Sequence, residues 1–174
     1  MLIPLAFALL LQIPPTPQLA PGTKYDPAIP TRQQVVGHGV TEVMTSPEQI
    51  VAYFQALAAA APERTRLVDL GRSWEGRAMV MLVIGSAERM ARLDQVKADL
   101  RRLADPRGLE PAEAERLVRE LPVVSAMIHG VHGNEMSSGG AAMAEAYHLL
   151  AARGDSTVDL ILRESLVLID PMQN

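Results

Sequence analysis

The residues best suited to chemistry in this sequence lie between Ile128 and Glu135, a stretch that reads Ile-His-Gly-Val-His-Gly-Asn-Glu. His132 and Glu135 are three residues apart, so in a first helical turn their side chains lie on one side and can share one metal ion. Zinc accepts imidazole nitrogen and carboxylate oxygen, and two such ligands plus a third make a catalytic site. The spacing therefore predicts that His132 and Glu135 are two ligands of a zinc ion.

The segments on either side of this motif indicate how it is positioned. Residues 122–128 are apolar and begin with a proline, which predicts a buried β-strand. Residues 137–152 are rich in Ala, Met, Leu and Glu, which predicts a helix. Gly130 and Gly133 flank His132, so the backbone there can turn tightly and approach a ligand closely. The end of a strand that leads into a helix is a usual place for ligand groups in α/β proteins.

Two interpretations stay open for the residues of this motif. His129 is predicted either to orient the metal site through a hydrogen bond or to be a strand-end histidine with a backbone partner. For His132 and Glu135, the alternative to zinc binding is that they only cap the following helix, where the helix dipole favours a carboxylate. A His-x-x-Glu pair alone is common by chance, so the zinc prediction depends on the flanking strand and glycines.

This part of the chain resembles the zinc carboxypeptidase (metallocarboxypeptidase) family, whose first two metal ligands lie in a His-x-x-Glu element. Residues 71–77, Gly-Arg-Ser-Trp-Glu-Gly-Arg, are similar to the family's hairpin turn, which commonly reads Gly-x-Ser-x-Glu-Gly-Arg. Residues 166–174 resemble the next core strand, which in the family runs into an Asn-Pro-Asp-Gly turn. The resemblance covers residues 45–174 and implies that His132 and Glu135 are the first and second zinc ligands.

The same resemblance places other parts of the site outside this sequence. In the family, the third histidine ligand, the general-base glutamate and the arginines that bind the substrate carboxylate all follow the Asn-Pro-Asp-Gly turn. His38 and His148 do not match the family pattern, and His38 is expected to be an ordinary loop histidine. Asn134 stands where some relatives carry a substrate-binding arginine, and its role stays open. The resemblance implies the N-terminal part of a longer protein, inactive by itself.

The function expected of the complete protein is zinc-dependent removal of a C-terminal residue from a peptide or protein substrate. In the mechanism that the resemblance implies, zinc polarises the scissile carbonyl and lowers the pKa of bound water. A glutamate beyond Asn174 then accepts the proton of that water.

Three other functions stay open at this point. Aspartoacylase and succinylglutamate desuccinylase relatives also use a His-Gly-x-Glu element and cleave small amides with zinc. A serine α/β-hydrolase can use a His-Gly oxyanion loop, but it needs a Gly-x-Ser-x-Gly turn, which this sequence lacks. A non-catalytic binding module would keep the fold and lose the site.

The amino-acid composition indicates the kind of core and argues against some classes of partner and metal site. Hydrophobic residues make up 48% of the chain but aromatic residues only 3%, so the core must depend on aliphatic side chains and methionine. The formal net charge is -4 and no basic cluster with interleaved aromatics is present, which argues against a nucleic-acid partner. Cysteine is absent, which excludes disulfides and thiolate metal sites.

The N-terminus predicts export. Residues 2–13 are apolar apart from Gln12, a stretch too short to span a bilayer but typical of a signal peptide. Residues 1–20 are therefore predicted to be a signal peptide and the protein to be secreted or periplasmic, although no Lys or Arg precedes the apolar stretch and the cleavage site stays open. Residues 21–45 are predicted to be a Pro-rich leader and N-terminal extension. Within it, residues 35–39 fit a short strand or part of the substrate-side rim.

Residues 46–174 are predicted to be the N-terminal part of a zinc peptidase catalytic domain. Ser46, Pro47 and Gln49 have the pattern of a helix start with a capping box. Tyr53 and Phe54 in that helix are predicted to be core residues. The other expected elements are strands over 66–70, 79–84 and 166–169 and helices over 88–103, 111–121 and 158–163. The helices at about 87–121 are longer than the family's usual connection and are predicted to be a helical insertion.

Together these elements predict an α/β fold with a mixed sheet flanked by helices. The strands of the hairpin are expected to be antiparallel, with an edge strand over 66–70 and a more buried strand over 79–84. The strand-helix-strand unit over 123–169 is expected to be parallel and right-handed. This mixed character agrees with the fold that the resemblance implies, the carboxypeptidase-like (phosphorylase/hydrolase-like) fold, incomplete in this chain.

Overall fold

The computed structural model describes residues 20–40 and 42–173, so the predicted signal peptide lies outside the described residues except for Ala20. The strands in chain order are β1 Lys24–Tyr25, β2 Thr65–Arg72, β3 Ala78–Ile84, β4 Val123–Ile128, β5 Ala152–Arg153 and β6 Ser165–Asp170. The helices are α1 Arg32–Val36, α2 Pro47–Ala60, α3 Ala87–Ala91, α4 Leu93–Ala104, α5 Pro111–Glu120, α6 Ser138–Ala151 and α7 Ser156–Glu164.

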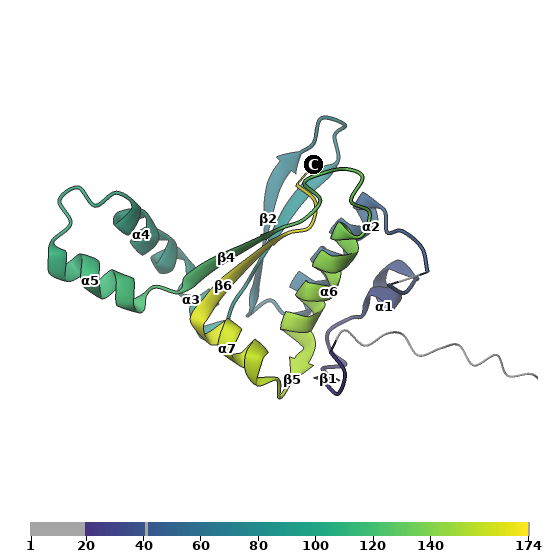
Figure 1. Cartoon of the computed structure of the whole chain (residues 1–174), viewed down its shortest axis with the longest axis horizontal. Coiled ribbons are helices and arrows are strands. Elements are labelled where there is room, and N and C mark those ends of the chain that lie inside the picture. Colours follow the sequence, from purple (N-terminus) through teal and green to yellow (C-terminus); the bar gives the residue numbers. More distant parts are fainter. Residues whose placement is uncertain (1–19, 41, 174) are drawn as a thin grey trace, which may run out of the picture.

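The four longer strands form one mixed sheet in the order β2-β3-β6-β4 (Figure 1). β2 pairs with β3 and β3 with β6 in antiparallel fashion, whereas β4 and β6 are parallel. Helices α2 and α6 pack against each other and against the sheet, and α7 contacts β6. The mixed α/β fold and the parallel β4–β6 pair are therefore confirmed.

The main core lies between α2, α6 and the sheet. α2 begins where predicted, because the Ser46 side chain accepts from the Gln49 N–H while the Gln49 side chain accepts from the Ser46 N–H. The helix then buries Tyr53 and Phe54, which confirms their predicted place in the core. The other large side chains that are fully buried in this core come from α2, β3, α6 and β6: Leu57, Leu82, Ile84, Met143, Leu150 and Ile169.

Strand β4 is not buried, and the prediction of a buried strand is wrong for the described residues. Val123 is 64% and Ile128 49% exposed, and the strand is exposed on both faces. The reason is its place in the sheet: β6 is the one described strand that pairs with β4, so β4 forms an edge. Its apolar residues on both faces have the pattern of a central parallel strand, but burial depends on neighbours that the local sequence does not specify.

The N-terminal extension contains elements that the sequence did not indicate. A helix, α1, occupies residues 32–36, so the suggestion of a short strand at residues 35–39 is wrong. Thr31 and Gln34 form a capping box at its start, and Gly37 ends it with a φ of 81°. Strand β1 pairs with β5, and Ile29 is buried in the main core. The part of the extension around these residues therefore packs on the body.

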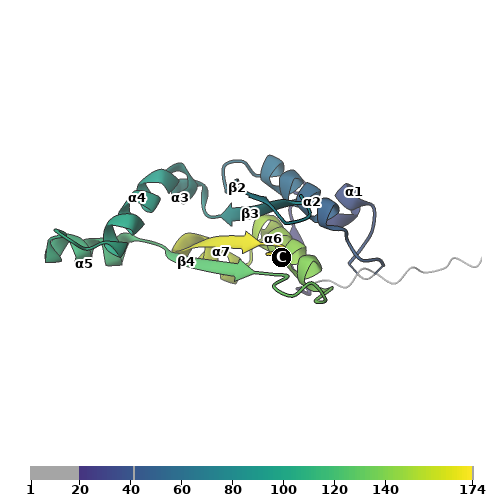
Figure 2. The same ribbon diagram turned by 90° about the horizontal axis from the view of Figure 1, so that it is seen from above.

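The helices between β3 and β4 lie beside the sheet rather than on it. Figures 1 and 2 show α4 and α5 as a pair that projects away from the body. The predicted helix over 88–103 is divided at Arg92 into α3 and α4, whereas α5 matches its prediction closely. Met90 and Val96 join this region to the sheet through a small apolar cluster with Val83 and Leu166. That these helices are an insertion relative to the family stays a prediction.

Two adjacent glycines of α6 offer a test of how tightly this helix packs on α2. A Cβ at Gly139 would lie 2.4 Å from Cδ1 of the buried Ile50, whereas a Cβ at Gly140 would meet only Nη1 of Arg32 at 3.7 Å. We expect Gly140→Ala to raise the free energy of unfolding by up to about 1 kcal/mol through helix propensity. The free energy of unfolding of Gly139→Ala is expected to be about 1–3 kcal/mol lower than that of Gly140→Ala, because the added methyl group would overpack the contact with Ile50.

Urea unfolding of both variants and the parent measures this difference. Equal free energies of unfolding for the two variants would contradict the close contact between α6 and α2.

Candidate metal site

His132 and Glu135 lie in a turn between β4 and α6. The Glu135 N–H donates to the His132 carbonyl at 3.1 Å, and α6 begins only at Ser138. Nδ1 of His132 and Oε1 of Glu135 are 2.9 Å apart. The two side chains are thus adjacent as predicted, but a turn before the helix brings them together rather than the first turn of the helix.

This pair is open to solvent and does not cap α6. The His132 side chain is 71% exposed and that of Glu135 48%. Both oxygens of the Glu135 carboxylate face His132, because Oε2 also accepts from the His132 backbone N–H at 3.4 Å. The N-cap of α6 is Ser137, and no side chain makes a capping hydrogen bond there. These contacts do not support the interpretation that the pair only caps the helix.

The turn begins at Gly130, where the chain leaves the sheet. Gly130 has a φ of 63°, and a Cβ there would lie 3.3 Å from Cα of Met172. Both the left-handed backbone and the close approach require glycine. Gly133, which was expected to serve the same purpose, has open space around it and no positive φ. One of the two flanking glycines therefore sets the path of the chain.

His129, just before this turn, is held by its backbone and by its side chain. Its N–H donates to the Asp170 carbonyl and its own carbonyl accepts from the Gln173 N–H, both at 2.9 Å. Its Nε2 lies 3.0 Å from Oε2 of Glu145 on α6. The backbone of His129 is thus held at the end of β4, and its side chain is joined to α6. Whether His129 acts on a metal site stays a prediction.

Asp170 adds a buried carboxyl group beside His129. The residue is 5% exposed, and this burial raises the pKa of the Asp170 carboxyl above its usual value. The Met172 N–H, which donates to Oδ1 at 3.1 Å, and the nearby His129 act in the opposite direction. Burial is the largest effect, so the neutral form of the Asp170 carboxyl is favoured more than it is in an unburied aspartate.

The described residues bring together two side chains of the types that bind zinc, those of His132 and Glu135, without a third. No group of three or more His, Cys, Asp or Glu side chains in residues 20–40 and 42–173 is arranged to hold a metal. His38 is a buried loop residue whose Nδ1 lies 3.4 Å from Arg32 Nη2. His148 is hydrogen-bonded to Tyr25 at 2.9 Å. His132 and Glu135 thus fit a metal ion by donor type and proximity, as part of a larger ligand set.

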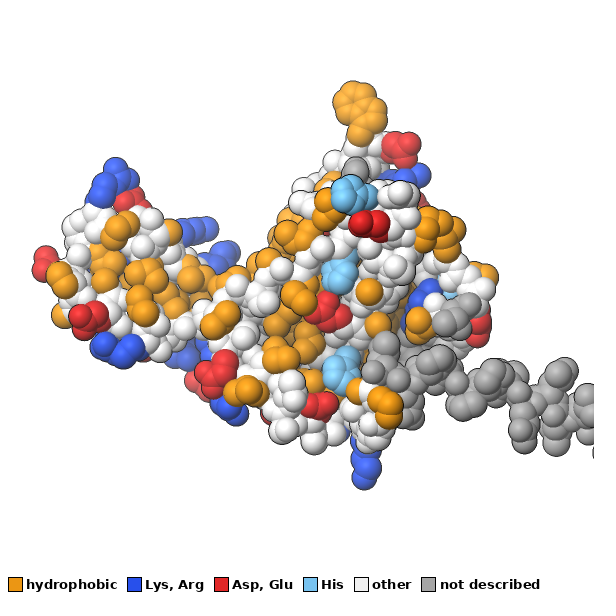
Figure 3. Space-filling model, viewed as in Figure 1, with side chains coloured by type: hydrophobic (Ala, Val, Ile, Leu, Met, Phe, Trp, Pro, Cys, Tyr) orange, Lys and Arg blue, Asp and Glu red, His pale blue; other side chains and the backbone are white. Residues whose placement is uncertain are grey.

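Figure 3 shows the histidines on one face of the molecule as separate patches, each beside an acidic side chain. Among the described residues, histidine–carboxylate contacts occur in His132–Glu135, His129–Glu145 and His148–Asp155. Asn134 is exposed on the same turn as His132, and its role stays a prediction.

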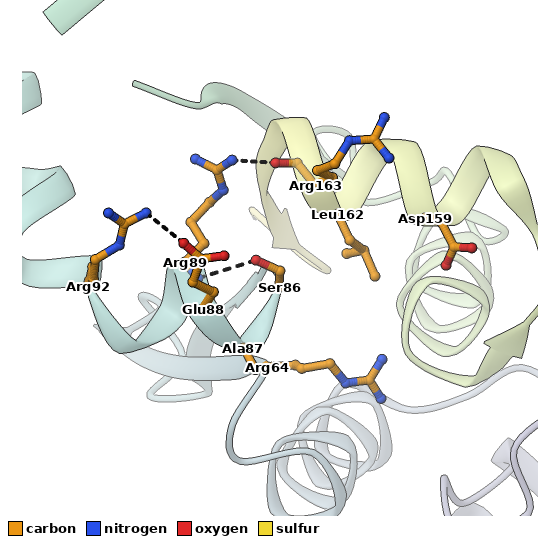
Figure 4. Close-up of a pocket in the computed structure, with 9 residues that line it drawn as sticks. All are labelled: Arg64, Ser86, Ala87, Glu88, Arg89, Arg92, Asp159, Leu162 and Arg163. Atoms are coloured by element: carbon orange, nitrogen blue, oxygen red, sulfur yellow. Dashed lines mark hydrogen bonds and ion pairs between the residues drawn. The ribbon is translucent and has the colours of Figure 1, made fainter. Parts of the chain in front are cut away.

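A cleft of about 450 Å³ lies elsewhere, between α3 and α7 (Figure 4). Its charged lining is rich in arginine, but these side chains already have partners: Arg64 donates to the Leu150 carbonyl, Arg92 to Glu88 and Arg163 to Glu164. α3 follows the end of β3 and α7 precedes the start of β6, so the cleft lies at the opposite end of the sheet from His132. It is not part of the candidate metal site.

Glu145 is the residue near the site that sequence reasoning missed. It is the one acidic residue in α6, a helix composed mainly of apolar and small residues. A carboxylate in such a helix is a signal that it has a specific partner, because an unpaired charge on a buried face is unfavourable. The partner, His129, lies on the strand side of the turn and could not be identified from spacing.

Comparison with known proteins identifies the family. A model of the zinc carboxypeptidase family matches residues 50–174, and the chain therefore belongs to this family. No curated protein matched the sequence.

Similar solved structures show the same fold. They include carboxypeptidase A from Helicoverpa armigera, at 21% identity and a TM-score of 0.54 over 83% of this chain and 27% of that one. Thrombin activatable fibrinolysis inhibitor (TAFI) matches at 10% identity and a TM-score of 0.50, over 82% of this chain and 29% of that one. The chain spans a little over a quarter of the length of these two structures.

The buried Asp170 carboxyl predicts a pH-dependent effect of substitution. Because its pKa is raised in the folded state, its stabilising contribution is present below the unfolded pKa and is lost as the pH rises through the folded pKa. Asp170→Asn keeps an oxygen to accept from Met172 and removes the charge. We expect a higher Tm than the parent at pH 7 and little difference near pH 3, measured by circular dichroism. A lower Tm at pH 7 would show that the favourable contacts of the carboxylate outweigh its burial.

Proposed function

We propose that the complete protein is a zinc-dependent carboxypeptidase that removes C-terminal residues from peptides or proteins, with His132 and Glu135 as two of the zinc ligands. The observation that supports this most directly is the 2.9 Å contact between Nδ1 of His132 and Oε1 of Glu135 at the end of a parallel strand. It occurs in a chain that belongs to the zinc carboxypeptidase family. The described residues by themselves are proposed to be inactive, because two ligands do not make a catalytic zinc site.

In this proposal the residues of this chain hold and place the metal. A zinc ion in such a site supplies a Lewis acid and lowers the pKa of bound water. His132 contributes a neutral imidazole nitrogen and Glu135 a carboxylate oxygen, and their exposure leaves them accessible to metal and substrate. Zinc binds the deprotonated forms of imidazole and carboxylate ligands, so zinc affinity is expected to fall as the pH falls.

The family match favours a peptidase over the aspartoacylase and desuccinylase alternative. No Gly-x-Ser-x-Gly turn is present in the sequence to support a serine hydrolase. A non-catalytic binding module of the same fold is the alternative that the zinc experiment below distinguishes.

We also propose that the protein is exported. The proposal depends on the apolar N-terminal stretch, which lies outside the described residues. Within residues 20–40 and 42–173, no helix is long and apolar enough to cross a membrane. The expected partner is a peptide or protein substrate, and the net charge of -4 gives no support for a nucleic-acid partner.

Metal analysis tests the site directly. After dialysis, the full-length protein is expected to retain one zinc ion per chain, and His132→Ala and Glu135→Ala are each expected to lose it. His148→Ala is the matched control, because this histidine also lies near a carboxylate but is distant in sequence from the turn. It is expected to keep the zinc.

A parent protein without zinc, or ligand variants that keep it, would contradict the proposed metallopeptidase and support a binding module. Stoichiometric zinc would make hydrolysis of C-terminally blocked and unblocked peptides the next assay. A carboxypeptidase should require the free C-terminal carboxylate.

A further inference from the structure

The turn that carries His132 and Glu135 has two stems, and one side-chain contact joins them. The first stem is the end of β4, where His129 is bonded through its backbone to Asp170 and Gln173. The second stem is α6, which carries Glu145. The His129–Glu145 contact of 3.0 Å connects two residues that are 16 apart in sequence and lie on opposite sides of the turn.

The turn between these stems is open to solvent. Residues 131–137 are all exposed, and the hydrogen bonds described for His132 and Glu135 connect these two residues to each other or to the start of α6. Gly130, at the beginning of the turn, has a left-handed backbone and lies close to Met172. The positions of the two ligands therefore depend on how firmly the stems are held together.

The His129–Glu145 contact is partly shielded from solvent and joins two rigid parts of the protein. The side chains of His129 and Glu145 are 19% and 25% exposed, so solvent screens the pair less than it screens an open surface pair. The backbone hydrogen bonds fix His129, and helix packing on α2 fixes Glu145. Two rigid partners lose little conformational freedom when they form a hydrogen bond.

We propose that Glu145 is a positioning residue for the metal site: through His129 it clamps the two stems of the 130–137 turn and so preorganises His132 and Glu135 for zinc. This inference rests on the proposed zinc-binding function but concerns a residue that touches neither the metal nor its ligands. Groups of this kind raise metal affinity by reducing the disorder that binding must overcome.

The test compares zinc affinity and turn mobility in the full-length protein. Glu145→Ala is expected to weaken zinc binding by about tenfold, as removal of outer hydrogen-bond partners commonly does. Glu145→Gln keeps an oxygen that can accept from Nε2 of His129 and is expected to recover most of the loss. Zinc dissociation constants come from competition with a chromophoric chelator. Amide hydrogen exchange of the metal-free protein is expected to be faster over residues 131–137 in Glu145→Ala and unchanged in Glu145→Gln.

His148→Ala provides a matched control on the same helix. It removes a histidine that lies 3.7 Å from the Asp155 carboxylate, with side-chain exposures of 25% and 23% that resemble those of the His129–Glu145 pair. A loss of thermal stability with normal zinc affinity is expected for this variant. If His148→Ala weakens zinc binding as much as Glu145→Ala does, the effect is one of general stability and the positioning role is wrong.

The outcomes separate this inference from the proposed function. A parent protein that binds no zinc contradicts the proposed function, and with it a role for Glu145 in metal binding. A parent that binds zinc, together with Glu145→Ala that binds it equally tightly, overturns the positioning role and leaves the metallopeptidase intact. Faster exchange of the turn without a change in zinc affinity also overturns it, because the clamp would then not matter to the metal.

Discussion

The parallel pairing of β4 with β6 is the interaction on which the rest of the candidate site depends. Ile128 lies opposite Asp170, so both strands end at the same edge of the sheet. The hydrogen bonds continue past the strands, where His129 is bonded to Asp170 and Gln173. Since a shift of one residue would turn every side chain of β4 to the other face, this register also decides that His129 reaches Glu145.

The second support of the site is α6, which reaches the sheet through its packing on α2. The absence of a side chain at Gly139 lets the helix approach Ile50, and the core below is closely packed aliphatic and aromatic surface. A rigid strand end and a rigid helix thus hold an exposed turn between them. This division suits a metal site, because ligands must be accessible while their spacing must be fixed.

Much of this arrangement could be predicted from local signals in the sequence. The Ser46 capping box, the apolar run of β6 and the His132–Glu135 spacing each depend on neighbours along the chain, and the structure confirms the first two as elements and the third as an adjacent pair. Two of the failures are of another kind. The exposure of β4 and the His129–Glu145 contact depend on residues distant in sequence, about which periodicity says nothing. The helix at residues 32–36 does have local signals, the Thr31–Gln34 capping box and Gly37, but it is only five residues long.

Strand β4 is exposed along the open side of the sheet, and the His132–Glu135 pair that follows it is exposed as well. Val123, Val124, Met127 and Ile128 leave apolar surface open on both faces of a strand whose outer edge has no described partner. Burial of such surface is favourable by about 25 cal/mol per Å², and an open apolar edge promotes association. The same strand leads directly to His132 and Glu135. A polypeptide segment that pairs with the open side of β4 would therefore lie beside the turn that carries these two side chains.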